Sequence, residues 1–376
     1  MIDDGVRDKH YRPSLSMRLM QIMHLDFLLL VGLALLILVG LGVLYSAGDQ
    51  SMSLIHRQLT RLGLALMVML VIAQIPSSTL RFWSPWMYVL GVILLVLVLL
   101  MGDVGKGAQR WLDLGFIRFQ PSEMMKLVTP MMIAWYFAEK PLPPSYKTLF
   151  TAAVLILVPT FLIARQPDLG TSLLIFAAGF FVIFLGGMSW RLMAGLAVLS
   201  ASLLPVLWHF MHDYQRGRVM TLLDPQRDPL GAGYHIIQSK IAIGSGGIYG
   251  RGWLNGTQSH LNFLPEQSTD FIFSVYAEEF GLLGGIVLLT LYAFIIIRGL
   301  VIAVQGQDTY ARLLGGSLSL TFFVYLFVNV GMVSGILPVV GVPLPLISYG
   351  GTSMVTLMAG FGMLMSINSH RRLWSK

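Results

Sequence analysis

A polar loop passes directly into an apolar helix at Phe263-Leu-Pro-Glu-Gln-Ser-Thr-Asp-Phe-Ile-Phe-Ser-Val-Tyr-Ala-Glu-Glu-Phe-Gly281. The carboxylate of Asp270 stands at the boundary between the two. Burying the charged form of a carboxyl group at the edge of a hydrocarbon environment costs free energy, unless a partner or a chemical role compensates for it. Asp270 is therefore a candidate functional residue of a protein that lies in a membrane.

The composition of the chain predicts a membrane protein. Of its 376 residues, 56% are hydrophobic and 11% charged, and the mean hydropathy is +0.74, whereas soluble domains have about 25% charged residues. We expect a single integral membrane domain over residues 1–376. Because the sequence has no cysteine, disulfides and cysteine-ligated metals are excluded. The first apolar run follows 24 mostly polar and basic residues and is long enough to span, which favours a signal anchor over a removable signal peptide.

Apolar runs that approach or exceed the roughly 20 residues needed to cross a bilayer predict an all-α polytopic fold with ten transmembrane helices. The predicted spans are 26–45, 58–75, 83–101, 122–138, 149–164, 169–187, 190–211, 270–297, 311–333 and 344–367. The fifth and sixth are separated only by Arg165-Gln-Pro-Asp168, so one broken hairpin is an alternative for this pair. Between the seventh and eighth spans lies a large extracytoplasmic loop, residues 212–269, named here the outer loop.

The distribution of basic residues predicts cytoplasmic termini, with tails at 1–24 and 368–376. The side predicted to be cytoplasmic has 13 basic residues: Arg7, Lys9, Arg12, Arg18, Arg81, Lys140, Lys147, Arg191, Arg298, Arg312, Arg371, Arg372 and Lys376. The other side has 12 on it or near it: Arg57, Arg61, Lys106, Arg110, Arg118, Lys126, Arg165, Arg216, Arg218, Arg227, Lys240 and Arg251. So many cations on the translocated face suggest an anion-binding site; for any one of them, a solvated loop charge or a lipid-headgroup contact is an equal alternative.

One of two polar segments on the outer face runs from Lys106 to Lys126. Pro121 suits the first turn of a helix, so Glu123 lies near a helix N-terminus, where negative charge is favoured. Glu123 and Lys126 are three residues apart and share a helix face. An ion pair within the membrane predicts a functional site, in which Lys126 is a candidate for binding phosphate. The alternative is a pair that only joins the fourth span to a neighbour.

The outer loop is the second polar segment. Loops longer than about 15 residues are often functional, so its 58 residues predict a folded cap. Arg216 and Arg218 offer two guanidinium groups suited to bidentate binding of phosphate. The apolar spacing of 231–244 predicts an amphipathic helix on the outer leaflet. The glycines of 244–252 indicate tight turns and not a nucleotide-binding loop, because neither a Gly-Lys-Ser/Thr ending nor a βαβ unit accompanies them.

Two roles remain open for Asp270 on these grounds. Ser268 or Thr269 can cap the eighth span, which would make Asp270 a charge that only stabilises the helix dipole. In a partly dry cleft the same carboxylate could act as a general base. Glu278 and Glu279 follow two turns later and point about 100° apart, so at most one shares the face of Asp270, and we expect both to be buried structural partners.

The run Asn329-Val-Gly-Met-Val-Ser-Gly-Ile-Leu-Pro-Val-Val-Gly-Val-Pro-Leu-Pro-Leu-Ile-Ser-Tyr-Gly-Gly-Thr-Ser353 closely resembles the signature of the shape, elongation, division and sporulation (SEDS) family. Its last six residues are expected to serve helix packing more than cavity lining. Four further segments are similar to that family in order and spacing: 119–126, 166–171, 231–253 and 264–273. The resemblance spans nearly the whole chain, and the outer loop is more similar to rod-shape members than to division members.

This resemblance implies a peptidoglycan glycosyltransferase that polymerises lipid II at the outer face of the bacterial cytoplasmic membrane. The essential aspartate of the family falls on Asp270. The positions implied or proposed to bind substrate are Arg110, Glu123, Lys126, Arg216, Arg218, Gln238 and Lys240. One departure is Gln267-Ser268, because relatives often have His, or Arg-His, before the Thr-Asp pair, and a helper role for that imidazole is in doubt here.

The family chemistry suggests a mechanism in which Asp270 deprotonates the 4-hydroxyl of the acceptor GlcNAc, which then displaces the diphosphate of the donor with inversion. The basic residues would stabilise the departing diphosphate, with or without a divalent cation, although the sequence contains no metal-binding motif. Expected partners are lipid II, membrane lipids, a class B penicillin-binding transpeptidase and the proteins of the elongation complex, with no nucleic acid. A lipid II transporter and a scaffold without activity are the alternatives.

Overall fold

The computed structural model describes residues 25–105, 108–113, 118–211, 213–227, 232–257 and 266–369. Within them the chain is mainly helical, which confirms the predicted class. The helices are α2 (Phe27–Ala47), α3 (Met52–Ala73), α4 (Ser77–Met101), α5 (Pro121–Ala138), α6 (Tyr146–Arg165), α7 (Leu169–Leu185), α8 (Trp190–Phe210), α9 (Asp213–Leu223), α10 (Ala232–Gly246), α12 (Ile272–Val304), α13 (Thr309–Val333) and α14 (Thr352–Ser369), with a 3-10 turn η1 (Pro225–Arg227).

Each of the ten predicted spans overlaps one helix, from α2 to α8 and from α12 to α14. Among the described residues, six helices are long and apolar enough to cross a membrane by length and composition alone: α2, α3, α4, α6, α12 and α13. Two further apolar segments, α7 and the Trp190–Leu203 part of α8, are shorter. The fifth and sixth predicted spans are two separate helices, α6 and α7.

Several predicted boundaries differ from the observed ones. The sequence predicts the last span from residue 344, but α14 begins at Thr352. The prolines at 343 and 345 disfavour helix, and Leu346 has a positive φ of 62°. At its other end α14 continues to Ser369, into the predicted C-terminal tail. The rest of that tail and the predicted N-terminal tail lie outside the described residues.

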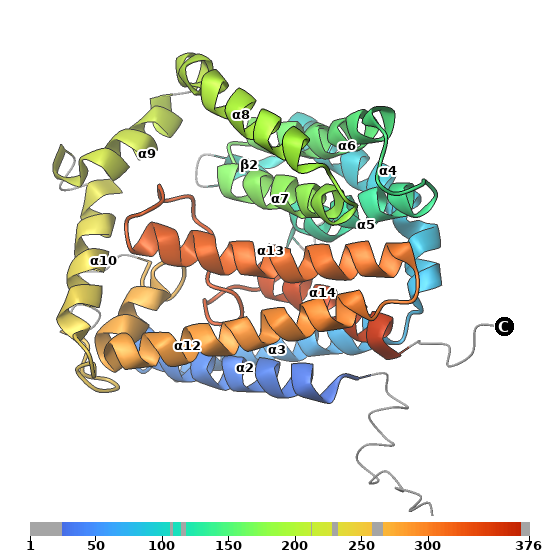
Figure 1. Cartoon of the computed structure of the whole chain (residues 1–376). Helices are drawn as coiled ribbons and strands as arrows, with labels where there is room; N and C mark the ends of the chain where they lie inside the picture. The colour runs from blue at the N-terminus through green and yellow to red at the C-terminus, as the bar shows by residue number, and fades with distance from the viewer. Residues whose placement is uncertain are drawn as a thin grey trace, which may run out of the picture.

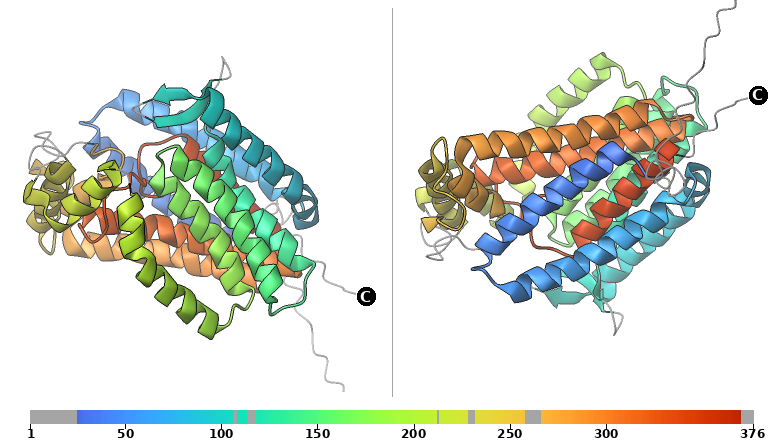
Figure 2. Two further views of the ribbon diagram at one scale, coloured as in Figure 1. Left: turned by 90° about the horizontal axis from the view of Figure 1, so that it is seen from above. Right: turned by 90° about the horizontal axis from the view of Figure 1, so that it is seen from below.

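The helices form one bundle with α5, α13 and α14 at its centre (Figure 1). Helices α12 and α13 lie side by side, α2 packs against α12, and α3 packs along α14, as the view from below also shows (Figure 2). Helices α4, α6 and α7 surround α5. The interior contains large side chains with almost no exposure, among them Phe137, Tyr292, Tyr310 and Tyr325. This packing fixes the central helices relative to one another.

A buried carboxylate, that of Asp26, connects three helices at one end of the bundle. Asp26 caps α2 by accepting a hydrogen bond from the backbone N–H of Leu29. The guanidinium of Arg298 on α12 donates to both oxygens of the same carboxylate, at 3.0 and 2.5 Å, and Asn368 on α14 donates at 2.9 Å. Because a buried charge needs full pairing, this group ties three helices together.

Helix α12 is broken at Gly281, whose φ of 62° and ψ of −160° are not helical. A strip of the outer loop, residues 246–254, fills the break. Leu282 and Leu283 donate backbone hydrogen bonds to Gly247 and Ile248, and the strip donates in return to the carbonyls of the two preceding glutamates. The backbone groups that the break releases are thereby satisfied. Gly247, Gly250 and Gly252 have positive φ values, as expected for tight turns, whereas Gly244 and Gly246 of the same glycine-rich run belong to α10.

Glu278 and Glu279 are buried, as predicted, and they bind the same part of the outer loop. Glu278 accepts hydrogen bonds from the backbone N–H of Thr257 at 2.9 Å and from its hydroxyl at 3.0 Å. Glu279 accepts from the backbone N–H of Leu254 at 3.2 Å and from the hydroxyl of Ser46 on α2. The two carboxylates therefore anchor the outer loop to α12.

A small antiparallel sheet between α4 and α5 departs from the all-α prediction. Its strands are β1 (Asp103–Gly105), β2 (Ala108–Asp113) and β3 (Arg118–Phe119), in the order β1-β2-β3. Strand β2 mixes polar residues with Trp111 and Leu112, so the segment is too polar to form a span and long enough to form a hairpin. A period of two is hard to detect in so few residues.

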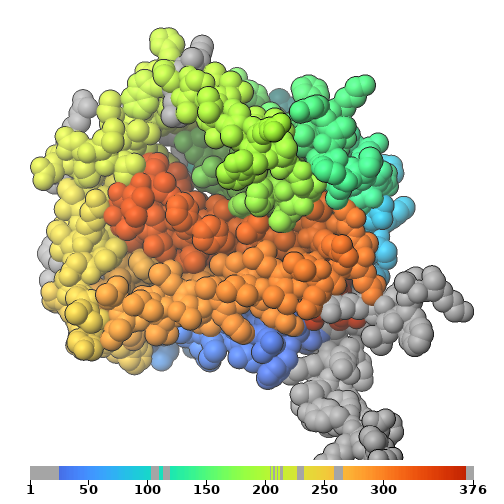
Figure 3. Space-filling view, in the orientation of Figure 1, coloured from blue at the N-terminus to red at the C-terminus, as the bar shows by residue number. Residues whose placement is uncertain are grey.

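Helix α10 confirms the helix predicted for 231–244, but its buried face lies on protein. Ser239 is fully buried and its hydroxyl lies 2.8 Å from that of Ser274 on α12. The same hydroxyl donates to the carbonyl of Val333 at 2.5 Å. The space-filling view shows α10 covering one end of α12, with α13 surfacing between α10 and α8 (Figure 3). The apolar face of α10 is thus largely used for packing within the molecule.

Candidate active site

The predicted catalytic residue lies at a polar cavity of about 370 Å³. Asp270 shares its lining with three of the predicted substrate-binding residues, Arg110, Glu123 and Lys126. The other described lining residues are Gln120, Asp168, Thr171, Leu174, Glu266, Thr269, Gly341, Val342, Pro343, Tyr349, Gly350, Gly351, Thr352 and Ser353. Segments far apart in sequence therefore meet here: β2, α5, the start of α7, the turn before α12 and the segment before α14.

Asp270 lies in the turn 266–271, before α12 begins. The N-cap residue of α12 is Phe271, with no side-chain cap, and the hydroxyl of Thr269 donates to Glu266 instead. Capping by Ser268 or Thr269, one of the two possibilities raised by the sequence, is therefore not what the structure contains. Asp270 is half-buried at the cavity surface.

The backbone around Asp270 is held by α13 and by the segment before α14. Asn329, fully buried on α13, donates to the carbonyl of Asp270 at 2.9 Å and to that of Val342 at 2.8 Å. The hydroxyl of Ser348 donates to the carbonyl of Thr269 at 2.5 Å, and the backbone N–H of Tyr349 donates to that of Ser268 at 2.8 Å. These bonds hold the backbone of the turn at Asp270 beside the cavity.

Glu123 and Lys126 form the predicted ion pair, with Nζ 2.7 Å from Oε1. Gln120 is the N-cap of α5 and Pro121 begins it, so Glu123 lies in the first turn as expected. Both side chains are buried, with residue exposures of 8% and 5%. The Lys126 ammonium also lies 5.3 Å from the ring centre of Tyr325 on α13.

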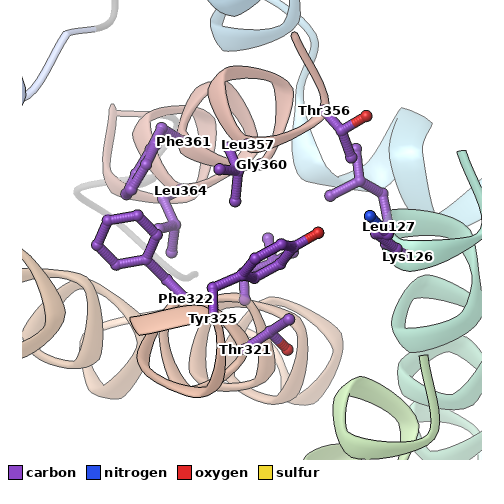
Figure 4. A pocket seen from close by; sticks show the side chains of 11 residues that line it. Lys126, Leu127, Thr321, Phe322, Tyr325, Thr356, Leu357, Gly360, Phe361 and Leu364 are labelled. Atoms are coloured by element: carbon purple, nitrogen blue, oxygen red, sulfur yellow. The ribbon is translucent and has the colours of Figure 1, made fainter. Parts of the chain in front are cut away.

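Lys126 also borders a second, smaller cavity between α5, α13 and α14. Figure 4 shows Tyr325 reaching from α13 toward Lys126, with Thr356 and Leu357 coming from α14. This cavity has a volume of only about 30 Å³ and its lining is mostly apolar. A space of that size has room for about one or two water molecules, so we regard it as packing space behind the polar cavity.

Arg110 on β2 reaches the polar cavity and is paired there. Its Nε lies 3.7 Å from the carboxylate of Asp168, and its Nη2 donates to the carbonyl of Pro167 at 2.5 Å. Asp168 is also the N-cap of α7, accepting from the backbone N–H of Thr171 at 3.2 Å. The pair therefore joins the sheet to the start of α7.

An apolar cavity of about 520 Å³ adjoins the polar one, and the two share Gln120, Glu123, Gly351 and Thr352. Consecutive residues of a strand point to opposite faces, and accordingly Arg110 lines the polar cavity while Trp111 lines the apolar one. On α5, Glu123 and Lys126 line the polar cavity, whereas Met124 and Leu127 line the apolar one. A ligand with a polar and an apolar part could therefore occupy both.

The other predicted substrate-binding residues lie outside the described lining of both cavities. Arg216 donates to the carbonyls of Trp208 and His209 at the end of α8, and Arg218 lies on α9. Gln238 and Lys240 lie on α10, where Lys240 lies against Gly335. The structure thus brings together Asp270, Arg110, Glu123 and Lys126, whereas the other four predicted residues are not among the described lining residues of either cavity.

Sequence reasoning missed several residues of the cavity. Asp168 and Glu266 lie within segments similar to the SEDS family, so the signal was present, but no role was assigned to them. Asn329 opens the long signature run, yet its bonds to Asp270 and Val342 became visible only in the fold. Tyr349, Thr352 and Ser353 belong to a segment expected mainly to pack helices, and it lines the cavity.

An imidazole lies beside this turn, although the sequence lacks the histidine that relatives have before the aspartate. The ring of His235 on α10 stacks on that of Phe271, with centres 5.7 Å apart. Burial lowers the pKa of His235, an effect that the nearby Glu266 partly opposes. His235 therefore packs, mainly as a neutral ring, against the residue that follows Asp270.

Comparison with known proteins relates the whole chain to one family. The model of the cell cycle protein family that comprises FtsW, RodA and SpoVE matches residues 19–373. Peptidoglycan glycosyltransferase MrdB of Escherichia coli K12 is 56% identical over 355 residues, covering 94% of this chain and 96% of that protein. Stage V sporulation protein E of Bacillus subtilis is 34% identical over 330 residues, covering 86% and 89%.

Solved structures agree with these relationships. A chain from a structure described as the structural coordination of polymerization and crosslinking by a peptidoglycan synthase complex matches with a TM-score of 0.81 and 32% identity, covering 93% of this chain and 98% of that one. The crystal structure of the rod shape determining protein RodA of Thermus thermophilus matches with a TM-score of 0.69 and 28% identity, covering 91% and 96%. The chain therefore belongs to the FtsW/RodA/SpoVE family of cell cycle proteins, the SEDS family that its sequence resembles.

Proposed function

We propose that this chain is a peptidoglycan glycosyltransferase that polymerises lipid II into β-1,4-linked glycan strands for cell elongation and rod shape. Its relatives MrdB and RodA have the name peptidoglycan glycosyltransferase. The observation that carries the proposal is the meeting of Asp270, Lys126 and Arg110 at a polar cavity that opens beside an apolar one. A substrate made of a sugar, a diphosphate and a polyprenyl chain needs both environments.

In the proposed reaction Asp270 accepts the proton of the acceptor's 4-hydroxyl as that oxygen bonds to the anomeric carbon of the donor. The bond from that carbon to the diphosphate oxygen breaks, the configuration inverts, and the electron pair leaves with the diphosphate. One carboxylate suffices, because the diphosphate needs no acid to protonate it, unlike the leaving group in glycoside hydrolysis. Lys126 and Arg110 line the same cavity and would stabilise the negative charge of the leaving group there.

A divalent cation remains part of the proposal. The described lining of the polar cavity has two cations and four carboxylates, Glu123, Asp168, Glu266 and Asp270, so its formal charge is unfavourable for a diphosphate. Carboxylate oxygens are suitable ligands for hard divalent cations. Because the described residues contain no cluster of three such ligands, we propose that the cation enters with the diphosphate and neutralises part of its charge.

For the topology we propose ten spans, α2 to α8 and α12 to α14, in the bacterial cytoplasmic membrane, with cytoplasmic termini and the polar cavity facing outward. Six of these helices are long and apolar enough to cross alone. Lipid II is displayed on the outer leaflet in this scheme, so its polyprenyl chain would enter from the bilayer. The apolar cavity beside Glu123 supports that route.

We further propose a class B penicillin-binding transpeptidase and the elongation complex as partners. One similar structure is a peptidoglycan synthase complex described as coordinating polymerization and crosslinking. A polymerase that releases uncrosslinked glycan benefits from a crosslinking enzyme beside it. The outer loop, held to α12 by Glu278 and Glu279, extends on the side where such an enzyme would lie.

The decisive experiment measures glycan synthesis by purified chain in liposomes with labelled lipid II, alone and with its transpeptidase. We expect glycan ladders from the wild type and a loss of about 100-fold or more in Asp270→Asn, as is typical for removing a general base. Glu139→Gln, at the far end of α5, is the control and should keep full activity. Lipid scrambling without ladders would favour the transporter alternative, and neither activity would favour the scaffold.

Folding of the Asp270 variant is checked in the same samples. Because the turn around Asp270 is held through backbone groups by Asn329, Ser348 and Tyr349, Asp270→Asn should unfold within a few degrees of the wild type. A large decrease in unfolding temperature together with lost activity would assign Asp270 a structural role and contradict the proposed base.

A further inference from the structure

Arg61 on α3 is a cation that the site described so far does not use. Its guanidinium carbon lies 4.5 Å from the ring centre of Tyr349, and its side chain lies against Gly351. Tyr349 and Gly351 line the polar cavity, whereas Arg61 lines the apolar cavity. Arg61 therefore stands where the two cavities join.

Among the described lining residues of the two cavities, three are cations, and they differ in how their charges are balanced. Lys126 is paired with Glu123 at 2.7 Å, and Arg110 with Asp168 at 3.7 Å. Among the residues that the structure describes, no carboxylate lies within ion-pair distance of Arg61. Arg61 is half-buried, so its charge is only partly stabilised by water. An anion bound where the two cavities join would balance the charge of Arg61.

The contact with Tyr349 orients the guanidinium for such an anion. The guanidinium carbon lies over the ring of Tyr349, and a contact of this kind with a ring face uses none of the N–H donors of the guanidinium. Those donors form the fork that matches two phosphate oxygens. Tyr349 is itself fixed, because its backbone N–H donates to Ser268, two residues before Asp270. The orientation of Arg61 is thus tied to the turn that holds the proposed base.

We infer that Arg61 binds the diphosphate of the lipid-linked substrate at the junction of the two cavities, between a sugar beside Asp270 and a polyprenyl chain in the apolar cavity. This inference rests on the proposed function. Arg61 would be the main protein cation for the charge of the leaving diphosphate, because Arg110 and Lys126 are already paired with carboxylates of the protein.

Binding of a polyprenyl diphosphate to the purified full-length chain tests this directly. Arg61→Gln should weaken binding about 10- to 100-fold, the range for hydrogen bonds between charged groups, and should affect a polyprenyl monophosphate of the same chain length less. Arg57→Gln is the matched control, one turn earlier on the same helix, exposed, and outside both cavity linings. Unchanged affinity in Arg61→Gln, or an equal loss in Arg57→Gln, would overturn the assignment.

A phospholipid headgroup is the other source of phosphate at such a place. Phosphatidylglycerol is therefore added as a competitor at increasing mole fraction. We expect it to displace the polyprenyl diphosphate weakly, and equally in wild type and Arg61→Gln. Displacement as effective as that by unlabelled polyprenyl diphosphate would make Arg61 a general headgroup contact and would contradict the inference.

A purely structural role for Arg61 is separated by two further variants. Arg61→Lys keeps the charge and should restore part of the binding, and Tyr349→Phe keeps the aromatic face and should bind almost as the wild type does. Both should unfold at nearly the wild-type temperature. If Arg61→Lys loses as much binding as Arg61→Gln and unfolds at an equally lowered temperature, Arg61 only joins α3 to the segment before α14.

The outcome is distinguishable from a failure of the proposed function. Glycan synthesis by the wild type with an unchanged KM for lipid II in Arg61→Gln would refute the role of Arg61 and leave the polymerase intact. Absence of synthesis by the wild type, with diphosphate binding that still depends on Arg61, would refute the polymerase and leave the binding site.

Discussion

Lys126 is a buried cation whose charge is balanced by one carboxylate, that of Glu123 three residues earlier in the sequence. Its ammonium is neutralised by Glu123 on the same face of α5 and faces the ring of Tyr325. Removing one member of a buried ion pair leaves the other as an uncompensated charge, which costs about 3–5 kcal/mol, whereas replacing both by apolar groups is often neutral. The effect of the pair on stability can therefore be measured separately from the role proposed for it in substrate binding.

We predict that Lys126→Met lowers the free energy of unfolding by about 3–5 kcal/mol, because Glu123 then stays buried without a partner. The double variant Glu123→Leu with Lys126→Met should recover most of that loss while remaining inactive. Thermal unfolding in detergent measures the first effect and glycan synthesis the second. If the double variant loses as much stability as Lys126→Met and Glu123→Leu lose in sum, the two side chains act independently.

At the scale of elements, the break in α12 decides how the outer loop attaches. Without the break, the helix would continue and the strip 246–254 would have no backbone partners on it. Gly281 permits the break, because its φ of 62° is one that other residues rarely adopt, and a side chain there would collide with the backbone of Gly250 and Ile248. The same glycine thus shapes α12 and docks the loop.

We predict that Gly281→Ala destabilises the protein by more than about 1 kcal/mol, the cost of a Cβ in an incompatible backbone conformation. Gly285→Ala, one turn later in α12, is the control, since a Cβ there meets nothing within 4 Å. It should remain within about 1 kcal/mol of the wild type, the difference in helix propensity. Unfolding temperature and protease sensitivity of the outer loop are the measurements, and equal behaviour of both variants would contradict the docking.

At the scale of the whole molecule, the two cavities exist because segments far apart in the sequence converge. Strand β2 contributes opposite faces to the two cavities, α5 divides them, and the start of α14 closes both. Asp26, Arg298 and Asn368 join α2, α12 and α14 at one end of the bundle. A polar cavity that faces outward, as proposed, requires a definite orientation of the bundle in the membrane.

The proposed orientation predicts which positions react with a membrane-impermeant thiol reagent. Because the sequence has no cysteine, single substitutions give labelling without background. Tyr249 is exposed on the outer loop, so Tyr249→Cys should be labelled in cells whose cytoplasmic membrane is intact, once the reagent can reach that membrane. Lys140 lies between α5 and α6, and Lys140→Cys should react only when the cytoplasmic membrane is permeabilised. Equal labelling of both in intact cells would contradict the ten-span topology.

The sequence alone predicted the helical membrane fold, the approximate positions of the helices and the Glu123–Lys126 pair, because hydropathy, helix periodicity and similar motifs are local properties of the chain. The catalytic role of Asp270 stays a prediction. The sequence could not determine that α14 begins at Thr352, that β2 forms, or that Asn329 and Ser348 hold the turn of Asp270, because these depend on contacts between distant segments. The same reason explains Arg216 and Arg218, which spacing and resemblance predict as substrate-binding residues and which are not among the described lining residues of the polar cavity. Only tertiary structure decides which charges share a cavity and which are already neutralised, since electrostatic pairing acts through space and not along the chain.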